Sequence, residues 1–220
     1  MKIWINVDIK VSRLVKFFVI SDFFLLAGWG FIDPIFAVFI VQKIAGGTLI
    51  TVGIAAAIYW ILKSIIQVPV SNYLDRTAGE KDDFTTLVGG LLLAGFSAAA
   101  FTLVRTATEL YLVEAMHAVA FALYSAAWPA IFSRHLDKDR FAFDWTLDST
   151  AVGVASGVTG LLGGIVATLW GYSAVFFGGS ILSFIAAFTL IAAPDLILPK
   201  PTVRAATTPI IERKEPEAGV

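Results

Sequence analysis

Long apolar stretches separated by short polar segments make up most of this chain. Six stretches hold about 20 or more mostly apolar residues, the length a helix needs to cross the hydrocarbon core at about 1.5 Å of rise per residue. Each polar backbone group is then satisfied within its own helix, as lipid demands. We therefore predict an all-α membrane protein with six transmembrane helices, at residues 17–42, 48–72, 84–104, 110–133, 145–169 and 174–193.

Composition supports the membrane assignment and excludes several functions. Of the 220 residues, 58% are hydrophobic and 15% charged, and the mean hydropathy is +0.82, whereas soluble domains are about half apolar and a quarter charged. The absence of cysteine excludes disulfides, thiolate metal sites and cysteine nucleophiles. A net charge of -1 gives no reason to expect a nucleic-acid partner. Without a hydrolase, zinc-protease or phosphate-loop motif, we expect neither an enzyme, nor catalytic residues, a metal or an organic cofactor.

Lysines and arginines in the polar segments predict the orientation, because their excess stays on the cytoplasmic side. If both termini lie inside, thirteen of the 16 basic residues are cytoplasmic, Lys43 and Arg105 are outside, and Lys63 lies within a span. We therefore expect both termini to be cytoplasmic and the protein to be integral to a bacterial-type plasma (inner) membrane. The connections are short, so we also expect consecutive helices to be antiparallel neighbours.

The chain divides into three parts. Residues 1–16 form a cytoplasmic N-terminal segment, which is either a simple lead-in to an uncleaved first helix or a short amphipathic helix on the membrane surface. Residues 17–193 form the transmembrane domain. Residues 194–220 mix five prolines with charges, which predicts a cytoplasmic disordered tail or a linker.

Small residues form a stripe along the fifth span. Helices in lipid approach closely where small residues face each other. Spacings of i, i+4, i+7 and i+11 place four glycines on one side of a helix, and we predict a close neighbour along them, either as plain packing or as a sliding surface. These glycines are Gly153, Gly157, Gly160 and Gly164. The same spacing is weaker in the third span, at Gly90, Ala94 and Ala98, and in the sixth, at Gly179, Ser183 and Ala187.

Charged residues inside the spans are unevenly distributed. Each costs about 2.5–3.5 kcal/mol or more at the bilayer centre, so such residues usually pair or face an interior. They are Asp22, Asp33, Lys63, Glu114, His117, Asp144 and Asp148, from the first, second, fourth and fifth spans. We expect these four helices to share an interior, and the uncharged third and sixth to be free to face lipid all round.

Two charge groups follow from the depth of these residues. Asp33, Glu114 and His117 lie in the outer half, where we expect them to converge on an outward-facing cavity and exchange protons near neutral pH. Alternatively, Glu114 and His117 are simply solvated near the interface. In the inner half, Lys63 needs a counter-charge: Asp148, one turn after Asp144, or otherwise Asp22. A pair with Asp148 would join the second and fifth spans, as static contact or as a gate.

Three short motifs carry a family resemblance. The segment between the second and third spans has Asp75-Arg76, with Ser71 four residues before and Gly79 three after Arg76, followed by Glu80, Lys81, Asp82 and Asp83. The fifth span ends its glycine-rich stretch with Gly163-Gly164, and a Trp-Gly-Tyr-Ser-Ala-Val-Phe turn begins at Trp170. These features resemble the N-terminal six-helix half of the major facilitator superfamily, whose signature loop reads Gly-x-x-x-Asp-Arg-x-Gly before a basic run.

The resemblance implies a major-facilitator-like half bundle with defined roles for its helices. Helices one and four would line a substrate cavity, two and five would lie at a moving interface, and three and six at the periphery. Asp75, Arg76 and Arg134 would form a cytoplasmic latch; otherwise these charges only set the topology. Family members have twelve helices in two such halves, so we expect a homodimer or a second six-helix half as partner, besides the lipid bilayer.

The function implied is a half-size or truncated secondary transporter that moves a small-molecule solute, coupled to an ion such as a proton or sodium and dependent on dimerisation. The alternative is a non-transporting membrane protein that serves interaction or scaffolding. A channel-like bundle is a third class, but the sequence contains no filter motif in its support. The clustered intramembrane charges favour transport.

Overall fold

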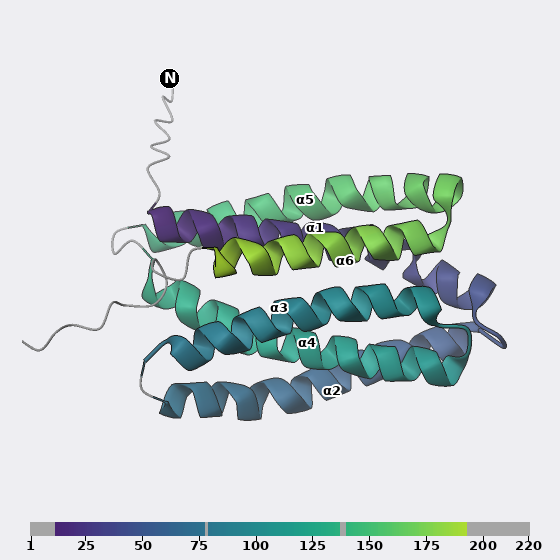
Figure 1. Ribbon diagram of the computed structural model, residues 1–220, viewed down its shortest axis with the longest axis horizontal. Helices are drawn as coiled ribbons and strands as arrows, with labels where there is room; N and C mark the ends of the chain where they lie inside the picture. Colours follow the sequence, from purple (N-terminus) through teal and green to yellow (C-terminus); the bar gives the residue numbers. More distant parts are fainter. Residues whose placement is uncertain (1–11, 78, 137–139, 193–220) are drawn as a thin grey trace, which may run out of the picture.

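The computed structural model describes residues 12–77, 79–136 and 140–192, and it confirms the all-α fold with six long helices. Residues 1–11 of the expected N-terminal segment and the expected tail at 194–220 lie outside the described residues. Figure 1 shows the helices as a bundle with nearly parallel axes. In chain order these are α1 (Arg13–Lys43), α2 (Leu49–Arg76), α3 (Lys81–Ala100) with the short 3-10 helix η1 (Phe101–Leu103), α4 (Ala107–Arg134), α5 (Phe141–Trp170) and α6 (Tyr172–Ile191).

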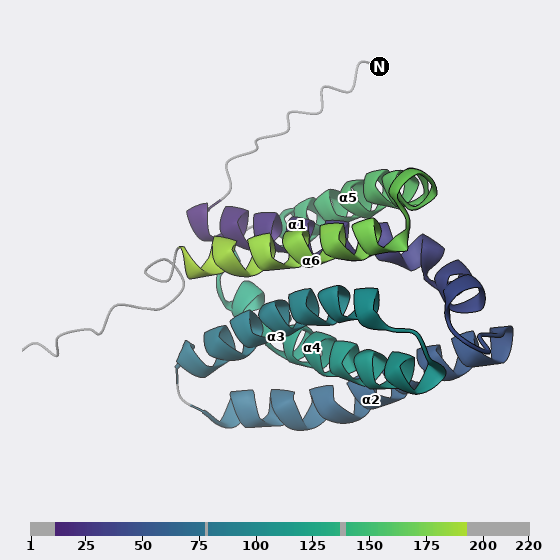
Figure 2. The same cartoon turned by 45° about the vertical axis from the view of Figure 1, so that its right-hand side comes forward.

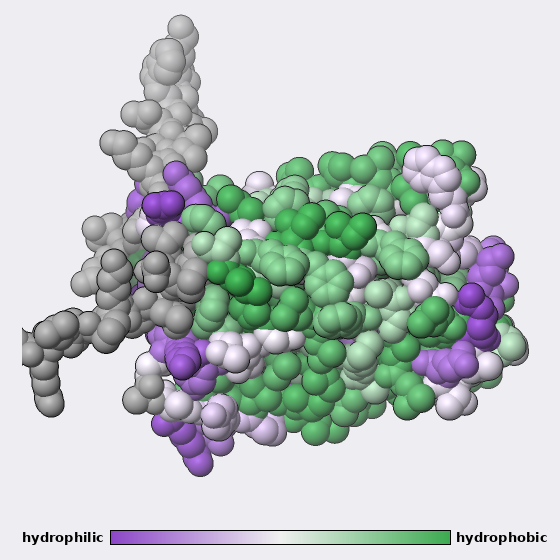
Figure 3. Space-filling view, in the orientation of Figure 1, coloured by the Kyte–Doolittle hydropathy of each residue, from purple (hydrophilic) through white to green (hydrophobic). Residues whose placement is uncertain are grey.

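All six helices are long and apolar enough to cross a membrane. Figure 3 shows the matching surface, an apolar belt with hydrophilic residues gathered at the two ends of the bundle. One end carries Arg13, Lys16, Arg76, Lys81, Arg134 and Arg140, which flank the helix termini there. We call it the basic end; the opposite end carries Lys43 and Arg105. The chain is an integral membrane protein, and the placement of its basic end in the cytoplasm remains a prediction.

The charged segment between the second and third expected spans is mostly helical, because both helices extend beyond those spans. α2 continues through Asp75 to Arg76, and α3 begins at Lys81. Asp82 and Asp83 therefore belong to α3. This helix carries charge at its first turn, whereas the expected third span had none. The helices are longer than the apolar stretches. Their charged terminal turns would lie in the polar headgroup region, where a helix need not be apolar.

Packing follows two central helices, α1 and α4. α1 packs mainly against α5 and α6, α4 packs mainly against α3 and α2, and α3 meets α6. The two groups form the two layers seen in Figures 1 and 2. Exchanging helices one to three with helices four to six leaves this set of pairs unchanged. The bundle thus has the contact pattern of two three-helix repeats, α1 to α3 and α4 to α6. The first helix of each repeat packs against the second and third helices of the other.

The expectation that consecutive helices are close neighbours is wrong for two of the five connections. Neither α2 with α3 nor α4 with α5 forms one of the substantial helix contacts in the described part of the chain. A short connection makes the chain turn back into the membrane. It does not choose the partner along the rest of the helix, which close-fitting side chains decide.

The expectation that the third and sixth helices face lipid all round is also wrong. In the most apolar 18-residue window of each helix, 44% of residues are buried in α3 and in α6, against 11% in α2 and 17% in α5. Absence of charge allows lipid contact but does not require it. Small residues give α3 and α6 their neighbours instead: an added Cβ at Gly179 would lie 2.9 Å from the Gly28 carbonyl oxygen, and one at Gly90 3.0 Å from the Ala120 oxygen.

The glycine stripe of α5 meets a neighbour at one position only, contrary to the expectation. Gly153, Gly157 and Gly164 have no atom within 4 Å of an added Cβ, whereas Gly160 meets the Pro34 ring at 3.4 Å. The close approach of α1 and α5 lies on the adjacent side, where Gly163 contacts the Phe31 carbonyl. The glycine spacing indicates where a neighbouring helix could approach α5 closely. It does not determine which side of α5 packs against α1.

Two glycines of α5 therefore provide a matched stability test. We expect Gly163→Ala to lower the free energy of unfolding by about 1–3 kcal/mol, because the new methyl group overlaps backbone and forces α1 and α5 apart. Gly157→Ala, on the same helix but facing open space, should leave it unchanged or raise it slightly. Thermal unfolding in detergent compares the two. Equal effects would contradict the assignment of the α1–α5 contact.

Candidate functional site

A cavity of about 410 Å³ lies between α1, α2 and α4, in the half of the bundle away from the basic end. All three residues expected to converge there, Asp33, Glu114 and His117, line it. The other lining residues are mostly apolar or aromatic: Leu26, Trp29, Phe36, Ala37, Val52, Ala56, Tyr59, Trp60 and Phe121. This is the composition of many small-molecule sites, an apolar wall with a few converging polar groups.

Glu114 and His117 form the polar centre of the cavity. They lie one turn apart on α4, and His117 Nδ1 is 3.1 Å from Glu114 Oε2. Glu114 is 3% exposed and His117 9% exposed, which excludes the alternative that the two are simply solvated at the interface. A carboxylate and an imidazole held together away from water can pass a proton between them or offer it to a bound molecule.

Aromatic rings fix the imidazole. The Trp29 ring stacks on His117 with centroids 3.8 Å apart and planes 5° from parallel, and Tyr59 stacks on it at 4.3 Å and 26°. Phe121 meets its edge at 5.0 Å. The imidazole is therefore held between a ring from α1 and a ring from α2, which joins the three helices at this point. Sequence reasoning missed Trp29 and Tyr59, because an aromatic residue in an apolar span has no distinguishing signal.

Asp33 completes the group from the α1 side. It lines the cavity but is exposed, and its carboxylate is close enough to Glu114 for the two to interact electrostatically. The Trp29 indole N–H is buried and has no hydrogen-bond partner among the described residues. The cavity therefore presents two carboxyl groups and an imidazole, which suit a polar solute.

Lys63 does not pair with Asp148 as expected. No ion pair to Lys63 occurs among the described residues; its ammonium lies over the rings of Trp60 and Tyr59, at 5.2 and 5.9 Å from their centroids. The expected pair fails because α2 packs on α4 and α5 packs on α1, so the two helices have no substantial contact. Cation–π contact, together with partial exposure, takes the place of a counter-charge.

The inner carboxylates instead gather around a tyrosine. The Tyr124 hydroxyl of α4 donates a hydrogen bond to Asp22 of α1, and Asp148 of α5 lies close enough to act electrostatically on both. Asp22 and Asp148 are 3% and 6% exposed. Asp144, one turn before Asp148, is fully buried and has interactions of its own. Asp22 and Asp148 of the expected inner group therefore interact with Tyr124, and Lys63 does not take part.

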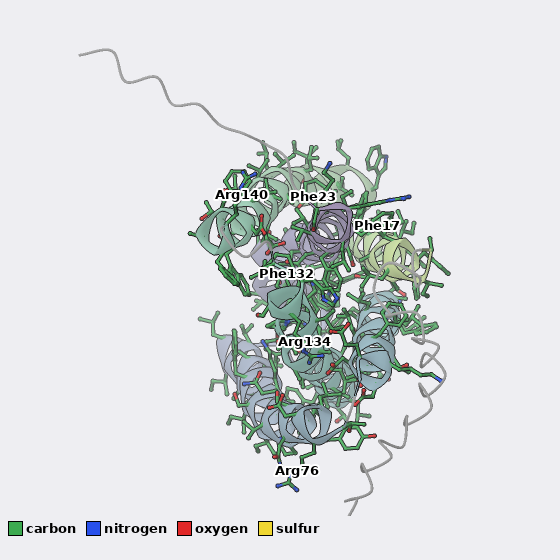
Figure 4. The ribbon with its side chains drawn as sticks, turned by 90° about the vertical axis from the view of Figure 1, so that its left-hand side faces the viewer. Phe17, Phe23, Arg76, Phe132, Arg134 and Arg140 are labelled. Atoms are coloured by element: carbon green, nitrogen blue, oxygen red, sulfur yellow. The ribbon has the colours of Figure 1, made fainter. Side chains whose placement is uncertain are left out.

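At the basic end, Arg134 joins α4 to the start of α3. Its guanidinium lies 2.6 Å from Asp83 and 3.5 Å from Glu80, and His135 lies 3.4 Å from the other Glu80 oxygen. The expected latch partners Asp75 and Arg76 are exposed and form no ion pair within the described ranges. The acids that interrupt the basic run are thus the ones that bind Arg134. Figure 4 looks onto this end, with Arg134 between Arg76 and Arg140.

A larger hollow, of about 510 Å³, opens at the opposite end beside the α5–α6 turn. Lys43 and Arg105 stand at its rim, and the Arg105 guanidinium donates to the Thr102 and Val104 carbonyls. Its position among helix ends and its mixture of Trp, Tyr, Lys and Arg are typical of the membrane interface. In the described part of the chain no group of His, Asp or Glu side chains could hold a metal ion.

Comparison with known proteins agrees with the six-helix fold. Residues 18–216 match the family model described as Major Facilitator Superfamily. The chain is similar in fold to the transporter reported as "In meso crystal structure of the POT family transporter PepTSo", with 12% sequence identity and a TM-score of 0.67. The match covers 87% of this chain and 40% of that one, so the chain spans less than half of that transporter. A search of curated proteins gave no match. The chain belongs to the major facilitator superfamily.

Proposed function

We propose that this chain is one six-helix unit of a secondary transporter that moves a small solute across a bacterial-type plasma membrane, with both ends of the unit in the cytoplasm. The observation that carries the proposal is the cavity in which Asp33 and the Glu114–His117 pair converge between α1, α2 and α4. Its acids and imidazole would bind the polar groups of the solute, and its aromatic rings would hold the apolar part. Asp33, Ala37 and Trp60 are exposed, so one side of the cavity is open to an incoming molecule.

A second six-helix unit would complete the transporter. α2 and α5 bury little within this chain, and large apolar side chains point outward along both, among them Ile61 and Ile65 of α2 and Val154 and Val158 of α5. Both helices flank the central pair α1 and α4, on which the cavity depends. Contact along these faces would enclose the open side of the cavity between two units, as alternating access requires. The partner would be a second copy of this chain or another six-helix half.

Ion coupling fits the same site. Glu114 and His117 are ionisable groups in hydrogen-bond contact within the cavity, and with one proton bound the pair carries no net charge. A proton is therefore the coupling ion that the geometry favours over sodium. At the basic end, the Arg134 contacts with Asp83 and Glu80 would act as the latch that opens and closes with the cycle.

The mass of the particle in mild detergent or nanodiscs tests the partner. We expect two copies of the chain per particle, because the faces of α2 and α5 are the least buried in the bundle. Native mass spectrometry, which resolves one 23.7 kDa chain from two, gives the number directly. A strict monomer that nevertheless transports would contradict self-assembly, and a monomer without flux would favour a heterologous half or the scaffold alternative.

Uptake into proteoliposomes tests the function itself. We expect vesicles containing the protein to accumulate at least one solute from a defined mixture of small metabolites when a pH gradient is imposed, and protein-free vesicles to accumulate none. Mass spectrometry of the washed vesicles identifies the solute. Absence of accumulation in either gradient direction, with two six-helix units present per particle, would favour the non-transporting interaction protein.

A further inference from the structure

The group formed by Asp22, Tyr124 and Asp148 lies apart from the cavity and nearer the basic end. Asp22 is nine residues after the start of α1 and Asp148 seven after the start of α5, both counted from that end. Tyr124 is ten residues before the end of α4. The three residues therefore come from three helices at similar depth, at the point where α1, α4 and α5 meet. Glu114 and His117 lie in the other half of the membrane.

The charge balance of this group is unusual. Two carboxyl groups are buried within electrostatic range of each other, and neither forms an ion pair among the described residues. Asp22 accepts a hydrogen bond from the Tyr124 hydroxyl, while Asp148 Oδ1 is buried and has no hydrogen-bond partner in the described part of the chain. Two buried carboxylates that interact electrostatically and have no cation partner are strongly disfavoured as a doubly ionised pair in a low-dielectric setting.

No ion pair found among the described residues gives Asp22 or Asp148 a counter-charge. On α5, Asp144 is one turn away and adds a further acid. On α4, Tyr124 is the polar group that contacts Asp22. Arg134, nearer the end of α4, is paired with Asp83 of α3 and with Glu80 of the α2–α3 connection. α6 packs on α1 but has no acidic or basic residue. Lys63 of α2 faces the aromatic rings of the cavity instead.

We propose that Asp22 and Asp148 form a proton-binding site, separate from the cavity of Asp33, Glu114 and His117, in which one of the two carboxyl groups carries a proton. Tyr124 is the positioning residue, since its hydroxyl proton orients Asp22. A proton fits better than a metal ion, because two carboxyl groups and a phenol offer too few oxygen ligands for the common divalent cations, in line with the absence of a metal-type cluster among the described residues.

The site links a proton to helix packing. With the proton bound, the pair carries one negative charge, balanced in part by the Tyr124 hydrogen bond. When the proton leaves to water, two like charges face each other across the α1–α5 contact, which is the most extensive in the bundle. The repulsion favours a state in which α5 moves away from α1. Its use as the coupling proton rests on the proposed transport function; its existence as a proton site does not.

Infrared spectroscopy of the full chain in nanodiscs tests the site without reference to transport. Near neutral pH we expect the absorption of a protonated carboxyl, shifted in heavy water, in the wild type. It should fall by one carboxyl per chain in Asp22→Asn/Asp148→Asn and stay unchanged in Asp75→Asn, which replaces an exposed aspartate near the same end. An unchanged signal in the double variant would overturn the proposal.

Tyr124→Phe provides a second test that does not depend on the double variant folding. The phenol donates to the ionised form of Asp22, so its loss should let the protonated signal persist to higher pH than in the wild type. The same signal should be indifferent to replacing choline chloride by sodium chloride. A signal that titrates identically with and without the Tyr124 hydroxyl, or one that sodium abolishes, would overturn the proton assignment.

Discussion

Glu114→Gln is expected to lower solute uptake by about a hundredfold while leaving the bundle folded. Glutamine keeps the shape of the side chain but can no longer hold a negative charge beside His117 or accept its proton. A hydrogen bond to a charged group contributes up to about 3 kcal/mol, and about 1.4 kcal/mol corresponds to each factor of ten. The measurement is initial uptake into proteoliposomes of the solute that the wild type accumulates.

Glu109→Gln is the matched control for this result. Glu109 lies on the same helix, five residues nearer the membrane surface, and accepts hydrogen bonds from the Arg105 and Thr106 backbone as part of a capping box. Glutamine can serve in that motif as well, so uptake should remain near the wild-type rate. Asp33→Asn should resemble Glu114→Gln. Wild-type uptake by both Glu114→Gln and Asp33→Asn would contradict the assignment of this cavity as the solute site.

Arg134→Gln is expected to reduce the free energy of unfolding by about 3 kcal/mol, the lower end of the range for breaking a buried pair. Asp83 is fully buried, and Arg134 is its nearest cation at 2.6 Å, so the variant leaves the carboxylate buried without compensation. The arginine side chain itself is 39% exposed, which argues against a larger effect. Chemical or thermal unfolding in detergent measures the change.

Two further variants separate this effect from a general loss of positive charge. Arg76→Gln removes an exposed cation from the same end and should stay within about 0.5 kcal/mol of the wild type. Asp83→Asn combined with Arg134→Gln should recover much of the lost stability, because no buried charge is then left alone. Equal destabilisation by Arg76→Gln and Arg134→Gln would show that loop charge alone matters at this end.

The fold could be predicted from the sequence largely because lipid imposes a simple rule on each helix. Any span of sufficient apolar length must be helical, so all six helices follow from hydropathy alone. Helix pairing could not be predicted in the same way. The regular glycine stripe of α5 is mostly uncovered, whereas Gly28 and Gly179, without an equally regular pattern, form one of the closest backbone contacts.

The candidate site shows the same division. The depth of Asp33, Glu114 and His117 in the membrane could be predicted from residue number and orientation alone. That depth was enough to predict that the three residues lie around one cavity. The partner of Lys63 depended on which helices touch, and the inferred Asp148 pair failed for that reason. The contact of Arg134 with Asp83 depended on the helix start at Lys81, which places Asp83 in the first turn of α3, facing α4.

Access of water to the cavity tests the central claim most directly, and it needs no knowledge of the solute. The chain has no cysteine, so Ala37→Cys places a single thiol at the cavity wall, six residues from the end of α1. Phe177→Cys, five residues into α6 from the same end, places one on the exposed apolar surface. With a membrane-impermeant maleimide added from the outer side, we predict rapid labelling of Ala37→Cys and slow labelling of Phe177→Cys. Equal, slow labelling of both thiols from either side would contradict a solute cavity between α1, α2 and α4.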